Sequence, residues 1–195
     1  PYTLTVDEKV QIKTHALIIS TGASAMWLGL ESETRLRGKG VSACATCDGA
    51  FFRNEHVAIV GGGDTAMEEA TFLTKFANKV TVIHRRNELR ASKAMQARAF
   101  ANEKIKFIWD SEVSEVLGDQ VVQGIQLKNR NSGELITLDD VTGLFVAIGH
   151  RPNTELFKEV LTMDDVGYIQ TKDQTTKTDL AGIFACGDAM DAVYR

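Results

Sequence analysis

Two closely spaced cysteines are the most reactive side chains in the sequence. Cys44 and Cys47 lie in the run Cys44-Ala45-Thr46-Cys47-Asp48, and one helical turn brings two side chains at this spacing together. A helix N-terminus here would lower the pKa of one thiol and favour the thiolate that attacks disulfides. Asp48 follows directly and could pass a proton to or from a departing thiolate. The pattern predicts a redox-active dithiol with Cys44, Cys47 and Asp48 as its catalytic residues.

Two other interpretations of the cysteine pair stay open at this point. One is half of a zinc site, although the sequence contains no second C-x-x-C or C-x-x-H pair to complete it. The other is a pair of inert, buried thiols. The remaining cysteine, Cys186, lies in an apolar stretch and is expected to be a small core residue. We therefore predict no metal site.

A glycine-rich turn lies between an apolar stretch and a helical one. The turn reads Gly61-Gly62-Gly63-Asp64-Thr65-Ala66, which fits the pattern G-x-G-x-x-A, and the strand before it is expected over 56–60. Such glycines allow a sharp bend and a close approach to a pyrophosphate, while the helix N-terminus faces the phosphates. We predict that these six residues bind a nucleotide. The alternative is an ordinary tight turn between a strand and a helix.

A cluster of basic residues follows the next expected strand, which covers 80–83. It reads His84-Arg85-Arg86, with Arg90 shortly after, at the position where an NAD enzyme carries an acidic residue for the ribose. Guanidinium groups bind phosphate oxygens through two parallel hydrogen bonds. The cluster therefore predicts recognition of the 2′-phosphate of NADPH, with a basic turn in solvent as the alternative.

The elements that must position these residues form an α/β pattern. Between 56 and 83 the chain reads as strand, tight turn, helix and strand, which predicts a right-handed crossover between parallel strands. In the helix, expected over 64–77, alanine and leucine residues recur on one face, and Glu68 and Glu69 lie off that face. Further expected elements are a helix at 92–103, strands at 16–19, 144–149 and 183–185, and antiparallel strands at 106–116, 121–127 and 134–138.

Composition limits the class of protein. The chain has 195 residues, 44% of them hydrophobic and 25% charged, as in ordinary globular proteins. Its net charge of −4 argues against general nucleic-acid binding. No apolar run approaches the ~18 residues of a membrane span, and no signal peptide opens the sequence. Three cysteines are too few for a disulfide-stapled secreted scaffold. We expect a cytoplasmic protein with neither nucleic-acid nor membrane partners.

Taken together, these residues resemble the low-molecular-weight, bacterial and plant type of thioredoxin reductase. The similarity runs through essentially the whole chain in the order of that family, and the combination of the dithiol with the arginine cluster is its specific part. The matching segments are Ala43-Cys44-Ala45-Thr46-Cys47-Asp48-Gly49, Gly61-Gly62-Gly63-Asp64-Thr65-Ala66, His84-Arg85-Arg86 with Arg90-Ala91, Gly143-Leu144-Phe145-Val146-Ala147-Ile148-Gly149-His150, and Gly187-Asp188.

The resemblance implies two Rossmann-like nucleotide-binding domains of the FAD/NAD(P)-linked disulfide reductase type. An NADPH-binding domain with the dithiol, at 25–150, would be inserted into an incomplete FAD domain formed by 1–24 and 151–195. Thr21-Gly22-Ala23 and Gly187-Asp188 match segments that contact FAD in the family. Electrons would pass from NADPH through FAD to the dithiol and on to thioredoxin. Because both sites on one domain must meet the same flavin, a rotation between the domains is expected.

The resemblance also implies a homodimer for the full-length enzyme and an orientation in which Cys47 faces the flavin and Cys44 lies outward. The family's first G-x-G-x-x-G, which holds the FAD diphosphate, and its C-terminal glycine-rich helix do not occur in these 195 residues. We therefore expect an internal fragment that holds FAD weakly or not at all. Two alternatives stay open: a flavin-linked reductase of another disulfide or peroxide partner, and, for the fragment, an NADPH-binding module without turnover.

Overall fold

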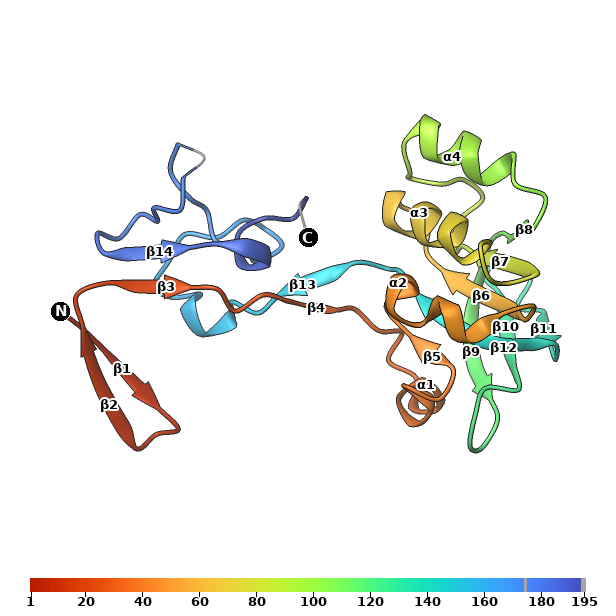
Figure 1. Cartoon of the computed structure of the whole chain (residues 1–195), viewed down its shortest axis with the longest axis horizontal. Coiled ribbons are helices and arrows are strands. Elements are labelled where there is room, and N and C mark those ends of the chain that lie inside the picture. Colours follow the sequence, from red (N-terminus) through yellow and green to blue (C-terminus); the bar gives the residue numbers. More distant parts are fainter. Residues whose placement is uncertain (174, 194–195) are drawn as a thin grey trace. The chain divides into compact units, whose positions relative to one another are not determined.

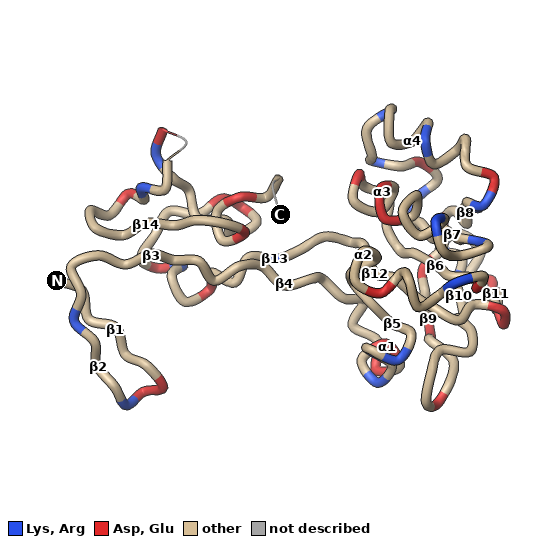
Figure 2. Tube along the Cα trace, viewed as in Figure 1, with Lys and Arg blue, Asp and Glu red and all other residues tan. Residues whose placement is uncertain are grey.

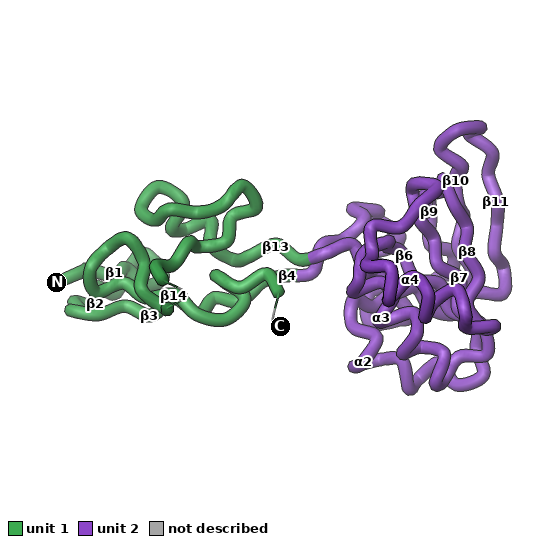
Figure 3. Tube along the Cα trace, turned by 90° about the horizontal axis from the view of Figure 1, so that it is seen from above, with its two compact units in different colours: residues 1–24, 150–195 green, residues 25–149 purple. Residues whose placement is uncertain are grey.

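The computed structural model describes residues 1–173 and 175–193, and the chain divides into two compact units. Unit 1 contains 1–24 and 150–195, and unit 2 contains 25–149 (Figure 3). Unit 2 is thus one continuous stretch, whereas unit 1 is assembled from the two ends of the chain. Each unit is described separately below.

A parallel five-stranded sheet forms the centre of unit 2 (Figure 1). Its strands are buried and apolar, as expected for a sheet covered on both faces. The glycine-rich turn follows the central strand, so the turn lies at the carboxyl edge of the sheet. In spatial order the strands are β5 (Val41–Ser42), β12 (Val141–Val146), β6 (His56–Val60), β7 (Lys79–Ile83) and β8 (Ile105–Ile108).

Side-chain alternation along the strands divides the core of unit 2 into two halves. Val57 and Ile59 of β6 pack with buried residues of α3 (Asp64–Leu73) and lie near α4 (Lys93–Phe100). Ala58 of the same strand faces the opposite side, where it packs with an antiparallel sheet. This second sheet contains β9 (Ser111–Leu117), β10 (Gly124–Asn129) and β11 (Leu135–Leu138). The central sheet is therefore held between helices and a second sheet.

The structure corrects several expected boundaries. The single strand expected over 106–116 is two strands, β8 and β9, which belong to different sheets. Asp110 separates them with a φ of 50°, a left-handed conformation that ends an extended strand. The helix expected over 64–77 ends at Leu73, and the one expected over 92–103 spans Lys93–Phe100 with Ser92 as its N-cap. The strand expected over 144–149 is β12, which ends at Val146.

Unit 2 also contains three short helical segments, of which only the turn at the cysteine pair was expected from the sequence. They are α1 (Glu31–Leu36), α2 (Ala45–Asp48) and η1 (Gly49–Phe52). α1 packs against β9, and α2 packs against α3. Because α2 continues directly into η1, the chain that carries the cysteine pair forms one compact helical turn over α3.

Unit 1 is built around a small parallel pair of strands, β3 (Leu17–Ile19) and β14 (Ile183–Ala185). A hairpin of β1 (Tyr2–Val6) and β2 (Val10–Thr14) precedes it, and η2 (Glu155–Phe157) and η3 (Gly187–Ala189) follow along the chain. Cys186 lies after β14 and is half-buried, so it is not the strand core residue that was expected. Ile19, Leu161, Ile169, Ile183, Ala185 and Ala189 form the core.

A second two-stranded pair lies where the chain passes between the units. Its strands are β4 (Ala23–Ala25) and β13 (His150–Pro152). On the side of unit 2, the Met26 N–H donates to the Gly149 carbonyl at 2.9 Å. On the side of unit 1, the Asn153 N–H donates to the Gly22 carbonyl at 2.9 Å. The two crossings of the chain are therefore hydrogen-bonded to each other.

Candidate redox and nucleotide sites

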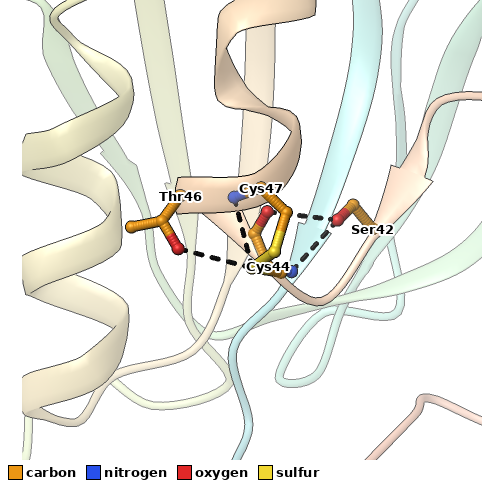
Figure 4. The surroundings of a disulfide bond; sticks show 4 residues. All are labelled: Ser42, Cys44, Thr46 and Cys47. Atoms are coloured by element: carbon orange, nitrogen blue, oxygen red, sulfur yellow. Dashed lines mark hydrogen bonds between the residues drawn. A yellow bond between two sulfur atoms is a disulfide. The ribbon is translucent and has the colours of Figure 1, made fainter.

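Cys44 and Cys47 form a disulfide at the start of α2 (Figure 4). Their Cα atoms are 5.3 Å apart, a normal separation for a bridged pair. Joined to each other, the sulfurs are neither half of a zinc site nor a pair of free buried thiols. In the part of the chain that the structure describes, no three His, Cys, Asp or Glu side chains are grouped to hold a metal.

Backbone hydrogen bonds at the disulfide favour negative charge on Cys44. Cys44 is the N-cap of α2, and its sulfur accepts the N–H of Cys47 at 3.2 Å. The Ser42 hydroxyl accepts the N–H of Cys44 at 3.0 Å and fixes the approach to the helix. An N–H donor directed at sulfur stabilises the thiolate formed on reduction. Cys47 is exposed and Cys44 half-buried, so exposure alone does not support the expected outward orientation of Cys44.

A largely apolar cavity of about 470 Å³ lies in unit 2, and its wall includes Ser42 and Asp48, which flank the cysteine pair in the chain. The predicted catalytic residue Asp48 therefore borders both the cysteine pair in sequence and this cavity. Phe51 of η1 lines the cavity and is 81% exposed. Sequence reasoning missed Phe51, although the aromatic pair four residues after Cys47 was visible. Other walls come from Gly38–Ser42, Phe52, Glu55, Val121, Val122 and Thr142.

The three glycines of the turn differ in what a side chain at each position would contact. A Cβ at Gly61 would collide with the Ala147 carbonyl oxygen and lie 2.6 Å from the Ala66 Cβ, so Gly61 and Ala66 together allow α3 to approach the sheet. A Cβ at Gly62 would collide with the ring of His84. At Gly63 a Cβ would meet nothing within 4 Å. Open space therefore lies at the N-cap of α3, where no side chain caps the helix.

The basic cluster folds back onto the glycine turn. The Gly62 carbonyl accepts the N–H groups of Arg90 and Ala91, at 2.8 and 3.0 Å. Arg85, Arg86 and Arg90 are exposed, and none has an acidic partner among the described residues. Figure 2 shows Lys and Arg positions around β7, β8 and α4 of unit 2. Unpaired guanidinium groups next to an uncapped helix N-terminus are suited to a phosphate.

His84 differs from the arginines that follow it, because its ring is buried against Gly62. Burial lowers its pKa, as do the charges of Arg90, Arg86 and Arg85, while the hydrogen bond to the Glu88 carbonyl opposes them. Nε2 lies 2.9 Å from that carbonyl oxygen, which can only accept, so the neutral ring carries its proton on Nε2. His84 thus connects the glycine turn to the basic loop.

Asp64 and Thr65, the next two residues of the turn, differ in their contacts. The Asp64 carboxylate accepts the Ser92 N–H at 2.9 Å, and this hydrogen bond lowers the Asp64 pKa. It therefore ties the start of α3 to the start of α4. Thr65 is exposed in the first turn of α3.

Two short segments of unit 1 lie at one edge of its parallel strand pair. Thr21-Gly22-Ala23 follows β3, and Gly187-Asp188 follows β14. The Cys186 N–H donates to the Ile19 carbonyl at 3.0 Å, so both strands end side by side. The carboxyl edge of parallel strands is where α/β folds bind ligands. Unit 1 therefore brings together the two segments that the resemblance assigned to FAD.

One side chain near the disulfide departs from the expected helix pattern. Glu68 is exposed as expected, but Glu69 is half-buried, and the Ala45 N–H of α2 is near enough to lower the pKa of its carboxyl group. Periodicity within α3 could not show this, because Ala45 belongs to another helix whose position against α3 the sequence does not show.

Comparison with known proteins agrees with this arrangement. The chain matches the pyridine nucleotide-disulphide oxidoreductase family model over residues 2–195. It is 56% identical over 183 residues to the thioredoxin reductase of Streptomyces coelicolor, covering 94% of this chain and 56% of that protein. It is 49% identical over 199 residues to that of Dictyostelium discoideum, covering 100% and 62%.

Solved structures of thioredoxin reductases are similar in fold. That of Giardia duodenalis has a TM-score of 0.85 at 42% identity, covering 100% of this chain and 64% of that one. The FR conformation of the Lactococcus lactis enzyme has a TM-score of 0.82 at 41% identity, covering 96% and 62%. The chain spans less than two thirds of the length of these relatives. With its mixed α/β fold, its C-x-x-C disulfide and its glycine turn, it belongs to the pyridine nucleotide-disulphide oxidoreductase family.

Proposed function

We propose that this chain is the dithiol- and NADPH-binding part of a thioredoxin-disulfide reductase. In the whole enzyme, electrons would pass from NADPH through FAD to the Cys44–Cys47 disulfide and on to thioredoxin. The observation that carries the proposal is a solvent-accessible disulfide in the same unit as a glycine turn with unpaired arginines. A catalytic disulfide is compatible with the cytoplasm, where the few disulfides that occur are usually catalytic. We place the activity there, in a homodimer of the full-length enzyme, as the resemblance implies.

The NADPH site in this proposal combines backbone and arginine donors at 25–150. The uncapped N-terminus of α3, with open space at Gly63, would receive the diphosphate, and Gly61 through Ala66 would form the turn beneath it. Arg85, Arg86 and Arg90 would bind the 2′-phosphate. His84, being neutral and buried, would hold the loop rather than carry charge.

Residues 1–24 and 151–195 would contribute to the FAD domain. Gly22 and Gly187 have φ values of 71° and 63°, and neither would place a Cβ within 4 Å of another group. The edge formed by Thr21-Gly22-Ala23 and Gly187-Asp188 thus has room for a ligand and fits a flavin nucleotide. When bound, FAD supplies a carrier that accepts the electron pair from NADPH and delivers it to the disulfide.

The reduced cysteine pair would act by thiol–disulfide exchange. A thiolate of the pair attacks one sulfur of the thioredoxin disulfide and forms a mixed disulfide, and the second cysteine then displaces thioredoxin as a dithiol. The S–S bond between Cys44 and Cys47 forms again in this step. Asp48 would supply the proton to the departing thiolate.

Thioredoxin would dock on the largely apolar cavity that Asp48 borders, with Phe51 as an anchor. An 81% exposed phenylalanine within one turn of a reactive disulfide is a typical contact residue for a protein partner. In the full-length enzyme, Phe51→Ala should raise the KM for thioredoxin about tenfold or more, since hot-spot truncations cost ~2 kcal/mol. Reduction of FAD by NADPH should stay unchanged. Phe100→Ala, which removes another exposed phenylalanine of unit 2, is the matched control.

The proposed function is tested in the full-length enzyme by measuring two reactions separately: reduction of the flavin by NADPH and reduction of thioredoxin. Cys44→Ser or Cys47→Ser should abolish thioredoxin reduction and leave NADPH-dependent flavin bleaching intact. If either variant still reduces thioredoxin, the dithiol is not the route. If wild type reduces another disulfide or a peroxide but not thioredoxin, the alternative partner class is correct.

This chain by itself should bind NADPH and hold FAD weakly. The N-terminal G-x-G-x-x-G of the family is not among its residues, so several charge-assisted hydrogen bonds, each worth roughly 1.5–3 kcal/mol, would be missing. FAD is added to purified chain, the sample is desalted, and the visible absorbance is measured. A colourless chain that binds NADPH agrees with this expectation, whereas stoichiometric flavin retention contradicts it.

A further inference from the structure

One face of α3 supports the helix that carries the disulfide. Ala45, the first residue of α2, is fully buried and belongs to the same core cluster as Leu73. A Cβ on Gly49 would lie 3.1 Å from a methyl group of Leu73, so η1 also sits directly on α3. Glu69 lies one turn before Leu73 on this face. An acidic side chain is therefore enclosed beneath the redox-active segment.

The Glu69 carboxyl group has one neighbour on that segment and one unpartnered oxygen. It lies close enough to the Ala45 N–H, directly after Cys44 in the chain, for that N–H to act on its pKa. Its Oε2 is buried and has no hydrogen-bond partner among the described residues. Burial raises the Glu69 pKa to about 7; the Ala45 N–H lowers it and the charge of Glu68 raises it. Both protonation states are thus accessible near neutral pH.

Among the described residues, no opposite charge acts on Glu69 in its ionised form. The charged group that acts on it is another carboxylate, Glu68, on its own helix. The charged or titratable side chains on the elements packed against α3 do not influence the Glu69 pKa; they are Asp48 of α2, Lys93 and Arg98 of α4, His56 of β6 and Lys79 of β7. A new negative charge nearby would therefore act on Glu69 directly.

Reduction of the disulfide creates such a charge. The Cys44 sulfur already accepts the N–H of Cys47, which favours a thiolate at Cys44. A Glu69 carboxylate near the adjacent Ala45 N–H would oppose that thiolate, since like charges within a few ångströms are not ionised together without cost.

We propose that Glu69 is a positioning residue that takes up a proton when the Cys44–Cys47 disulfide is reduced. A dithiol or dihydroflavin reductant supplies two electrons, the S–S bond breaks, and two protons are taken up. One proton goes to the sulfur of Cys47 and the other to Glu69, so that Cys44 stays a thiolate. Its relevance to turnover rests on the proposed function, but the proton linkage is a property of this chain alone.

The linkage is measured as the number of protons exchanged when the disulfide is reduced. Cys186→Ser leaves Cys44 and Cys47 as the only thiols. The chain is reduced with dithiothreitol in weak buffer between pH 6 and 9, and the change in pH per disulfide reduced is recorded with an indicator dye. Glu69→Gln keeps a carbonyl oxygen near the Ala45 N–H and removes the group that would take up the proton. A purely structural role therefore predicts the same proton exchange in the wild type and the variant.

Above about pH 7, where Glu69 is mostly ionised in the oxidised chain, Glu69→Gln should take up fewer protons per disulfide reduced than the wild type, by up to one proton. Glu68→Gln, at the adjacent exposed position, is the matched control and should take up the same number of protons as the wild type. An unchanged number for Glu69→Gln, or equal changes in both variants, overturns the proposal.

A second measurement covers the case in which Glu69→Gln does not fold. The infrared difference spectrum between reduced and oxidised wild-type chain should gain the C=O band of a protonated carboxyl group, and Glu68→Gln should retain this gain. Absence of the band overturns the proposal. Neither measurement uses NADPH, FAD or thioredoxin, so failure of thioredoxin reduction leaves the result for Glu69 standing, and the reverse also holds.

Discussion

Gly62→Ala is the sharpest test of how the glycine turn is built. The added methyl group would point into the ring of His84, which is 5% exposed and hydrogen-bonded to the Glu88 carbonyl. The ring also packs edge-on against Trp109, with 6.3 Å between ring centroids. His84 therefore cannot move aside without losing its hydrogen bond or disturbing this packing.

The cost of Gly62→Ala follows from these contacts. Overpacking a buried site costs about 1–3 kcal/mol, and leaving the His84 ring or the Glu88 carbonyl without its partner adds about 1–3 kcal/mol. We expect the free energy of unfolding of unit 2 to fall by roughly 2–6 kcal/mol. Gly63→Ala is the control, because its methyl group would meet nothing within 4 Å. It should cost less than about 1 kcal/mol.

Urea titration followed by tryptophan fluorescence measures this change, since both tryptophans, Trp27 and Trp109, belong to unit 2. A double-mutant cycle with His84→Ala identifies the cause. Removing the ring makes room for the methyl group, so the double variant should be more stable than the sum of the single changes predicts, by about 1 kcal/mol or more. Equal losses for Gly62→Ala and Gly63→Ala, or strict additivity in the cycle, would refute the reasoning.

Two further predictions concern charge. Replacing both Arg85 and Arg86 by Ala should weaken NADPH binding on the order of a hundredfold, about 2.7 kcal/mol, and change NADH binding little. Isothermal titration calorimetry measures the affinity for each nucleotide. Equal losses for both would show that the arginines do not recognise the 2′-phosphate. His56 is buried between Asp140 and the Thr81 hydroxyl, and burial lowers its pKa below the usual 6.5. The unfolded chain therefore binds the proton more readily, so stability should be complete above about pH 6.5 and fall below it. His56→Gln should flatten this slope in urea titrations between pH 7 and 5, and an unchanged slope would contradict the assignment.

The centre of unit 2 could be predicted from the sequence because its signals are local. The apolar run 56–60 is the strand β6 with the predicted bounds, and the glycine turn does open α3. The hairpin of β1 and β2 was missed because Val6, Val10 and Ile12 are largely exposed and show no buried face. The break at Asp110 was missed because apolar residues keep recurring among polar ones through 106–116 while the chain changes sheets.

Within the site, the sequence identified residue types but not their partners. The cysteine pair was predicted from spacing alone, and the structure has it as a disulfide. His84 was grouped with the arginines by adjacency, whereas its ring is buried against Gly62. Glu69 was placed on the outer face of α3 because nothing in the sequence showed that α2 would cover it. In both residues, the burial of the side chain depends on contacts with residues that are distant in the sequence.

The hydrogen bond between Met26 and Gly149 has a consequence for modularity. Because Met26 and Gly149 are hydrogen-bonded to each other, the stretch 26–149 behaves toward the rest of the chain as a loop whose ends are already closed. Its length imposes little entropic cost on the rest of the chain. We expect that such a segment can be exchanged, circularly permuted or replaced by a tight turn with β4 and β13 still paired. The architecture thus allows the dithiol-bearing module to evolve as a cassette.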